Sequence, residues 1–192
     1  MDHAELEQLI KRCQDGEQAA FNELLDTYGP KVYAYFYRVT GAQEQAEDLL
    51  QDLFVKLIEK IHLYKHQNKF EHWLFRIAAN QARDRARKFA SRGYTASIND
   101  DGGKDYDTLA SQLPGETLPP ESDLIMREEV DALQDALAQL PEFDREIIML
   151  RHYSQMSFKD IAQECNIPLG TALAKVHRGL KELKRILQYE CP

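Results

Sequence analysis

The sequence contains few cysteines and no long apolar run, and each shortage excludes a class of protein. Its 192 residues include three cysteines, at positions 13, 165 and 191, and no CxxC pair. A disulfide framework and a thiolate zinc site are therefore not expected, and the reducing cytoplasm is the expected compartment. The longest apolar run, residues 32–37, has six residues, against the roughly 18 that a membrane span needs. Because the chain opens on acidic residues rather than on a signal peptide, we expect no membrane insertion.

Common catalytic motifs are also missing. The sequence has no GxxxxGK[ST] phosphate loop, no GxGxxG, no HExxH and no GxSxG. His62, His66 and His72 make a metal site conceivable, but the segment between them is loop-like. The acidic pair Asp100-Asp101 lies in a segment that we expect to be a flexible linker, too mobile to hold a catalytic geometry. We therefore expect no enzyme, metal, cofactor or small-molecule substrate; a metal-dependent nuclease is a minor alternative.

The chain does carry charge of both signs, in separate blocks. Its net charge is −8, yet residues 70–92 hold six basic and two acidic side chains. Residues 93–135 hold 11 acidic and two basic side chains, and residues 136–192 have a net charge of +1. Phosphate attraction acts within a Debye length of about 8 Å at physiological salt, so the local basic blocks matter more than the net charge. The pattern favours two nucleic-acid-binding segments separated by an acidic spacer.

The spacing of apolar residues predicts an all-α fold of two small helical domains. Between residues 43 and 61 they recur at three- and four-residue steps, with Leu53, Leu57 and Ile58 among them. Before it, Gly29-Pro30 predicts the end of one helix and the start of another. Of residues 93–123, 19 are Gly, Pro, Ser, Thr, Asn or Asp, a composition that buries too little to fold. We therefore expect domains at 1–92 and 124–192, joined by a flexible acidic linker at 93–123.

The sharpest local signal is a helix-turn-helix near the end of the chain. Ser157 and Asp160 form a capping box before a short helix, a turn follows at 166–168, and a longer basic helix comes next. Such a second helix reads base edges in the major groove. An ordinary bundle helix with a solvated charged face is the alternative. The polar candidates early in that helix are Thr171, Lys175, His177, Arg178 and Lys181.

Two further segments have open interpretations. In the basic segment 70–92, Phe70, Trp73 and Phe75 accompany the cations, which suits unstacked bases on aromatic rings; Trp73 and Phe75 could instead belong to the core. Asp48, Gln51 and Asp52 share the polar face of their helix. They could form a docking face for a protein, although the pattern alone favours a merely solvated one.

Several runs together resemble the bacterial RNA polymerase sigma factors of the extracytoplasmic-function (ECF) group, in the sigma-70 family. AFNEL at 20–24, AEDLLQDLF at 46–54 and FEHWLFRIAAN at 70–80 are similar to region 2 of that family. LPEFDREIIMLR at 140–151 and IPLGTALAKVHR at 167–178 are similar to region 4. The order and spacing of these runs are specific, and they cover nearly the whole chain outside the linker.

The resemblance implies a function and a role for each segment. Core RNA polymerase would dock on Asp48, Gln51 and Asp52, which replaces the solvated-face interpretation. The first domain would open the minus-ten promoter element and hold a flipped base, and the helix-turn-helix would read the minus-thirty-five element as duplex. The acidic linker would thread the polymerase channels, and an anti-sigma factor would be the regulator. The implied minus-ten residues are Lys65, Asn68, Lys69, Trp73, Arg76, Asn80, Arg83 and Arg87.

The chain departs from the family in its recognition helix. The usual run after Gly-Thr is close to Val-Lys-Ser-Arg, whereas this chain has Ala172, Leu173, Ala174 and Lys175. Either Leu173 and Ala174 touch thymine methyl groups or upstream contact is weak, because each lost base contact is worth about 1–3 kcal/mol. A stand-alone helix-turn-helix regulator that acts without polymerase is the main alternative function, but it leaves the aromatic and basic surface of the first domain unexplained.

Overall fold

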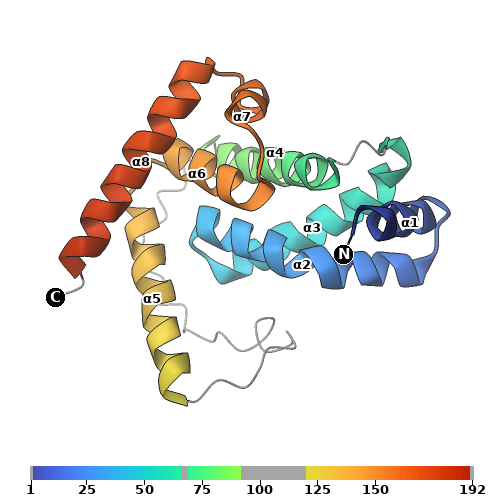
Figure 1. Cartoon of the computed structure of the whole chain (residues 1–192), viewed down its shortest axis with the longest axis horizontal. Helices are drawn as coiled ribbons and strands as arrows, with labels where there is room; N and C mark the ends of the chain where they lie inside the picture. Colours follow the sequence, from blue (N-terminus) through green and yellow to red (C-terminus); the bar gives the residue numbers. More distant parts are fainter. Residues whose placement is uncertain (1, 66–68, 92–119, 191–192) are drawn as a thin grey trace.

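The computed structural model describes residues 2–65, 69–91 and 120–190, and every regular element in these ranges is helical (Figure 1). The prediction of an all-α fold is confirmed. The expected linker falls almost wholly on residues 92–119, outside the described residues. The elements are α1 (His3–Gln14), α2 (Gln18–Thr40), α3 (Gln43–Lys60), the 3-10 turn η1 (Ile61–Leu63), α4 (Phe70–Ser91), α5 (Pro120–Ala138), α6 (Glu142–Ser154), α7 (Phe158–Glu164) and α8 (Leu169–Glu190).

Helices α1 to α4 pack around one apolar core. Tyr35 and Phe36 on α2, Leu53 on α3 and Phe75 on α4 are all fully buried in it. The apolar stripe of α3 therefore faces inward as expected, with one difference. Ile58, predicted to lie on that stripe, is 53% exposed, because it lies at the edge of the stripe, one turn after the half-buried Phe54.

The prediction that a helix ends at Gly29-Pro30 is wrong. Helix α2 runs unbroken from Gln18 to Thr40 with Pro30 inside it. A proline within a helix removes one hydrogen bond and crowds the preceding turn. Helix α2 continues because Tyr28 and Val32, on either side of the proline, are both buried in the core. Packing of this long apolar face outweighs the local cost of the proline.

Helices α5 to α8 form the second group. Helix α5 begins at Pro120, so the last four residues of the expected linker, 120–123, are helical. The capping box of Ser157 and Asp160 starts α7 as predicted, and Asn166 adopts a left-handed φ of 52° in the turn before α8. Helix α8 passes close to α6, since a Cβ added at Gly179 would lie 2.4 Å from Ile148 Cδ1.

The two groups of helices lie against each other, with α6 beside α2 and α4 (Figure 1). Tyr153 of α6 stacks on Phe75 of α4 with the ring centroids 6.3 Å apart. It also meets Tyr35 of α2 edge-on at 6.2 Å. Arg38 of α2 donates to the backbone oxygen of Val130 on α5 at 3.0 Å. None of the described helices combines the length and apolar character that crossing a membrane requires.

Candidate nucleic-acid interface

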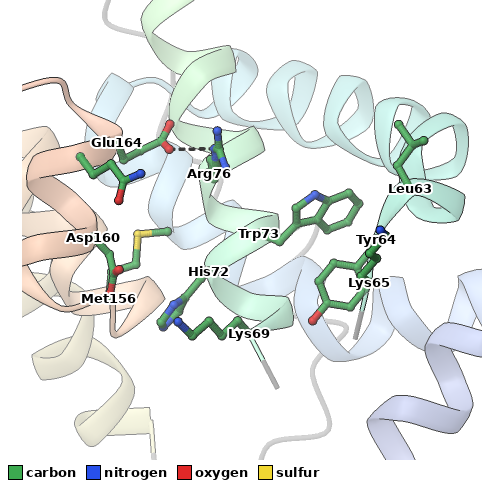
Figure 2. Close-up of a pocket in the computed structure, with 11 residues that line it drawn as sticks. Leu63, Tyr64, Lys65, Lys69, His72, Trp73, Arg76, Met156, Asp160 and Glu164 are labelled. Carbon is green, nitrogen blue, oxygen red and sulfur yellow. Dashed lines mark ion pairs between the residues drawn. The ribbon is translucent and has the colours of Figure 1, made fainter. Parts of the chain in front are cut away.

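A pocket of about 490 Å³ opens where the end of η1, the start of α4 and helix α7 meet (Figure 2). Two of its lining residues are aromatic, Tyr64 and Trp73, with ring centroids 5.1 Å apart. The buried Phe70 ring lies behind them, 5.4 Å from the Tyr64 ring. Trp73 is half-buried, so part of its ring faces the opening. The lining residues are Leu63, Tyr64, Lys65, Lys69, His72, Trp73, Arg76, Met156, Asp160, Gln163 and Glu164.

Cations surround this pocket on the side of the first domain. Lys65 and Lys69 are exposed at its rim, and Arg76 lines it from the next turn of α4. The predicted base-contacting residue Asn68 lies outside the described residues. A half-buried ring beside several cations can stack an unpaired base while the charges hold its phosphates. The structure therefore brings together four of the predicted minus-ten residues, including Trp73.

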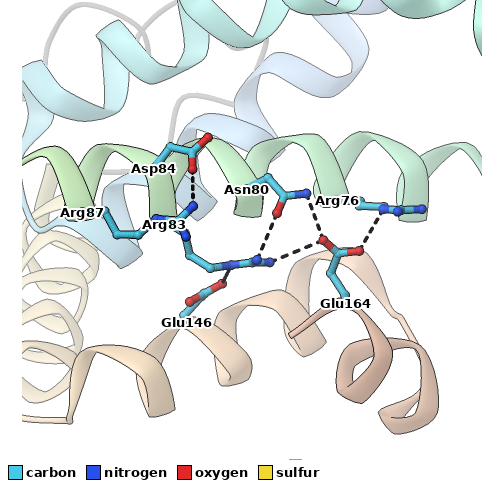
Figure 3. Close-up of polar contacts among 7 residues, drawn as sticks. All are labelled: Arg76, Asn80, Arg83, Asp84, Arg87, Glu146 and Glu164. Atoms are coloured by element: carbon cyan, nitrogen blue, oxygen red, sulfur yellow. Dashed lines mark hydrogen bonds and ion pairs between the residues drawn. The ribbon is translucent and has the colours of Figure 1, made fainter. Parts of the chain in front are cut away.

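The next predicted residues along α4 are held by carboxylates of the second domain (Figure 3). Glu164 at the end of α7 lies 2.9 Å from Arg76 Nε and accepts a hydrogen bond from Asn80 Nδ2 at 3.0 Å. Arg83 Nε donates to Glu146 Oε1 on α6 at 2.7 Å, and its Nη1 donates to Asn80 Oδ1 at 3.0 Å. Arg76, Asn80 and Arg83 follow at steps of four and three residues, so they share one face of α4.

The acidic partners in this network are more deeply buried than the basic ones. The Glu146 side chain is 6% exposed and that of Glu164 is 11% exposed, against 25% for Arg83 and 65% for Arg76. Burial raises the pKa of the Glu146 carboxyl, although the Arg83 guanidinium acts in the opposite direction. Neither glutamate was a sequence candidate. Arg87, the last predicted residue on α4, pairs with Asp84 on its own helix and stays exposed.

The helix-turn-helix presents a mixed apolar and basic face on α8. Leu173, Ala174, His177, Arg178 and Lys181 are all exposed along it, and Thr171 is half-buried. Lys175 differs, because its ammonium pairs with Asp144 of α6. It also lies 5.0 Å from the centroid of the Phe143 ring. Five of the seven predicted minus-thirty-five residues therefore face solvent, whereas Lys175 is tied to α6.

The polar face of α3 lies on the surface, as predicted. Asp48, Gln51 and Asp52 are exposed, and Val55 continues the same face one turn later with 57% exposure. Arg85 of α4 donates to Asp48 across 2.9 Å. Val55 was not a sequence candidate, although its place seven residues after Asp48 puts it on this face of the helix. An apolar centre with a polar rim is the common anatomy of protein interfaces, and Val55 beside these polar side chains has that arrangement.

Comparisons with known proteins agree with this organisation. The family model described as Sigma-70 region 2 matches residues 24–92, and the one described as Sigma-70, region 4 matches residues 131–183. The chain is 32% identical over 179 residues to the ECF RNA polymerase sigma factor SigW of Bacillus subtilis, which covers 93% of this chain and 95% of the relative. It is 33% identical over 184 residues to the RNA polymerase sigma factor CarQ of Myxococcus xanthus, with 93% and 95% covered.

A solved structure supports the same relationship. The sigma factor RpoE of Bartonella quintana, in complex with the anti-sigma factor NepR, matches with a TM-score of 0.60 and 25% identity. The match covers 88% of this chain and 96% of that chain. The resemblance noted in the sequence is confirmed. The alternative function, a stand-alone regulator that acts without polymerase, is not supported by these relatives. From its two matched regions and its relatives over nearly the full length, this chain belongs to the ECF sigma factors of RNA polymerase, in the sigma-70 family.

Proposed function

We propose that the chain performs no chemistry of its own and selects promoters by binding two different forms of DNA for core RNA polymerase. The observation that carries this proposal is the presence in one chain of two unlike surfaces, each suited to a different form of DNA. The pocket at Trp73 suits an unstacked base, while the exposed face of α8 around Arg178 suits the major groove of a duplex. A factor that must both find and open a promoter needs both surfaces.

At the downstream element, the pocket would trap a base that has left the stack. The free energy of stacking on Trp73, together with attraction of the phosphates to Lys65 and Lys69, would shift the melting equilibrium toward open DNA. Further along α4, the strand would run past Arg76, Asn80, Arg83 and Arg87. By the family resemblance, Asn68 would complete the pocket.

At the upstream element, α8 would lie in the major groove. Arg178 and Lys181, with His177, would donate to base edges or phosphates. Leu173 and Ala174 are exposed beside them, and apolar groups in the major groove recognise the methyl group of thymine. Lys175 would act on the position of α8 through its pair with Asp144, rather than by contact with a base.

The polymerase would bind the exposed face of α3. Asp48, Gln51 and Asp52 supply charge and hydrogen bonds there, and Val55 supplies apolar area. Since the relative RpoE was solved with an anti-sigma factor, we also propose a regulator of that kind for this chain. The cytoplasm, where polymerase and promoter DNA meet, is the proposed location.

The direct test of the proposal follows promoter opening by fluorescence. A promoter duplex with 2-aminopurine in its downstream element is mixed with core polymerase, with the chain, or with both. We expect the fluorescence of the unstacked base to rise only with both present, and Trp73→Ala to lower that signal at least tenfold. Opening by the chain without polymerase would favour the stand-alone regulator instead.

A further inference from the structure

Gln14, the last residue of α1, holds the backbone of the turn that leads into the pocket at Trp73. Its side-chain Nε2 donates to the carbonyl oxygen of Ile61 at 3.0 Å and to that of Tyr64 at 2.9 Å. An amide nitrogen carries two hydrogens, so one side chain supplies both bonds. Helix α1 lies beside η1 (Figure 1). Gln14 was not a sequence candidate, because the bonded residues are 47 and 50 positions away along the chain.

Both acceptors belong to the same tight turn. The Ile61 oxygen also accepts the backbone N–H of Tyr64 at 3.1 Å, and this hydrogen bond closes the 3-10 turn η1. The Tyr64 oxygen belongs to the planar peptide bond that joins Tyr64 to Lys65. Because hydrogen bonds are directional, the donor on Gln14 restricts rotation of that peptide plane. Gln14 therefore sets the direction in which the chain leaves η1.

The residues on either side of this peptide bond line the pocket. Tyr64 is 7% exposed, and its ring contacts the Trp73 ring at 5.1 Å between centroids (Figure 2). Lys65 follows at the exposed rim. A rotation of the backbone at Tyr64 would therefore move an aromatic ring that supports Trp73 and a cation that borders the opening.

Other contacts fix the position from which Gln14 reaches the turn. Arg12, two residues earlier, donates to both carboxyl oxygens of Glu17 at 2.9 and 2.7 Å. It also donates to Glu23 of α2 at 2.8 Å. Cys13, between Arg12 and Gln14, is buried in the core. The end of α1 is thus anchored to α2, so Gln14 presents its amide from a fixed backbone.

Such an arrangement favours binding through order that exists before the ligand arrives. Fixing a backbone segment costs conformational entropy, and a site that is already ordered avoids this cost at the moment of binding. Gln14 is not among the described residues that line the pocket. Any effect of Gln14 on a bound base would therefore pass through the backbone at Tyr64 rather than through contact with the base.

We propose that Gln14 is a positioning residue for capture of the unstacked base, because it holds the peptide between Tyr64 and Lys65 in the orientation that the pocket needs. The proposal rests on the proposed function, which takes this pocket as the site of that base. Loss of both hydrogen bonds should weaken capture about fivefold, since one such bond changes an equilibrium by roughly two- to tenfold. Docking of polymerase on α3 and reading of the duplex by α8 should be unchanged.

The test uses the full chain with core polymerase and a promoter whose downstream element is already unpaired. Each base of one strand of that element is removed in turn to leave an abasic site, and fluorescence anisotropy measures the affinity of the complex for each DNA. For the wild-type chain, removal of the captured base should lower the affinity about tenfold, because its stacking is lost. Gln14→Ala should bind the intact DNA about fivefold more weakly than the wild-type chain. On the DNA that lacks the captured base, both chains should bind equally.

Two further variants separate the hydrogen bonds from general effects on the fold. Gln14→Met has a side chain of similar length without N–H donors, so it should show the same losses as Gln14→Ala. Gln8→Ala removes the same type of residue from an exposed position of α1 and should behave as the wild-type chain. Circular dichroism at the assay temperature shows that each variant is folded, and pull-down with core enzyme should give equal polymerase binding.

Three results would overturn the role of Gln14. These are wild-type affinity of Gln14→Ala for the intact DNA, wild-type affinity of Gln14→Met, and an equal loss in Gln14→Ala on intact and abasic DNA. The last result would reveal a general defect rather than a defect of the pocket. The proposed function fails in a different way: a wild-type complex that tolerates removal of every base captures none of them. If removal of one base weakens the wild-type chain and Gln14→Ala equally, only the role of Gln14 is wrong.

Discussion

Arg85 on α4 donates to Asp48 on α3 across 2.9 Å, so one residue of the proposed polymerase face is already paired within the chain. Asp48 keeps 52% of its side chain exposed in this pair, and an ion pair so open to water contributes about 0–1 kcal/mol to stability. Asp52, one turn further along α3, is exposed as well. The charge of this face therefore contributes little to the stability of the fold.

Reversing the charge of Asp52 separates docking from folding. Asp52→Lys should weaken binding to core polymerase about tenfold, because one reversed charge at a surface contact changes the interaction by about 1–2 kcal/mol. The free energy of unfolding should change by no more than about 0.5 kcal/mol. Pull-down with core enzyme and thermal unfolding measure the two effects. Asp26→Lys makes the same charge change at an exposed position of α2 and should leave polymerase binding intact. Equal losses of polymerase affinity in the two variants would contradict the assignment.

The apolar part of the recognition helix has a test at the level of a single methyl group. Each upstream thymine is replaced in turn by deoxyuridine, and promoter binding is measured with the polymerase complex. For at least one position the wild-type complex should lose about threefold in affinity, whereas Leu173→Ala should be insensitive to the replacement. Arg178→Ala is the matched control: it should bind both duplexes at least threefold more weakly and keep the sensitivity. A wild-type complex indifferent to every replacement would show that Leu173 reads no methyl group.

The close crossing of α6 and α8 depends on Gly179. A Cβ there would lie 2.4 Å from Ile148 Cδ1 and 3.9 Å from Leu140 Cδ1. Gly179→Ala should therefore destabilise the chain by about 1–3 kcal/mol through overpacking, which outweighs the gain of up to about 1 kcal/mol in helix propensity. Thermal unfolding measures the balance. Gly170→Ala meets no atom within 4 Å, so its melting temperature should not fall. A stable Gly179→Ala would mean that the Ile148 side chain can turn away from the added methyl group at no cost.

The two described thiols should react slowly at neutral pH. Burial raises the pKa of Cys13 and the pKa of Cys165 to about 11. At pH 8 about one thiol in a thousand is then ionised, so its reaction with a disulfide reagent should be about a hundredfold slower than that of a free cysteine. The rate should rise about tenfold per unit between pH 8 and pH 10. Reaction with a chromogenic disulfide, followed in a Cys191→Ser variant, measures this, and two fast thiols at pH 8 would contradict it.

Local features of the fold were predictable because local chemistry specifies them. The capping box of Ser157 and Asp160 marks the start of α7 by itself. The exposed face of α8 follows from helical periodicity in the same way. The continuous α2 was not predictable from its own residues, because burial of Tyr28 and Val32 against other helices outweighs the effect of Pro30.

The contacts that join α4 to α6 and α7 were not predictable either. Arg83 and Glu146 are 63 residues apart, and Arg83 and Glu164 are 81 residues apart. No periodicity or motif connects such positions, because their contact depends on how two separate helical groups pack. The sequence indicated which α4 residues we propose as donors to DNA, whereas the carboxylates that pair with those donors were found only from the structure.

Run-off transcription with purified core polymerase tests the central claim most directly. A template that carries a genomic promoter library is transcribed with core enzyme alone and with core enzyme plus the chain, and the 5′ ends of the RNA are mapped. The account predicts a defined set of start sites that appears only when the chain is present and disappears with Asp52→Lys. An identical pattern of start sites with and without the chain would contradict it.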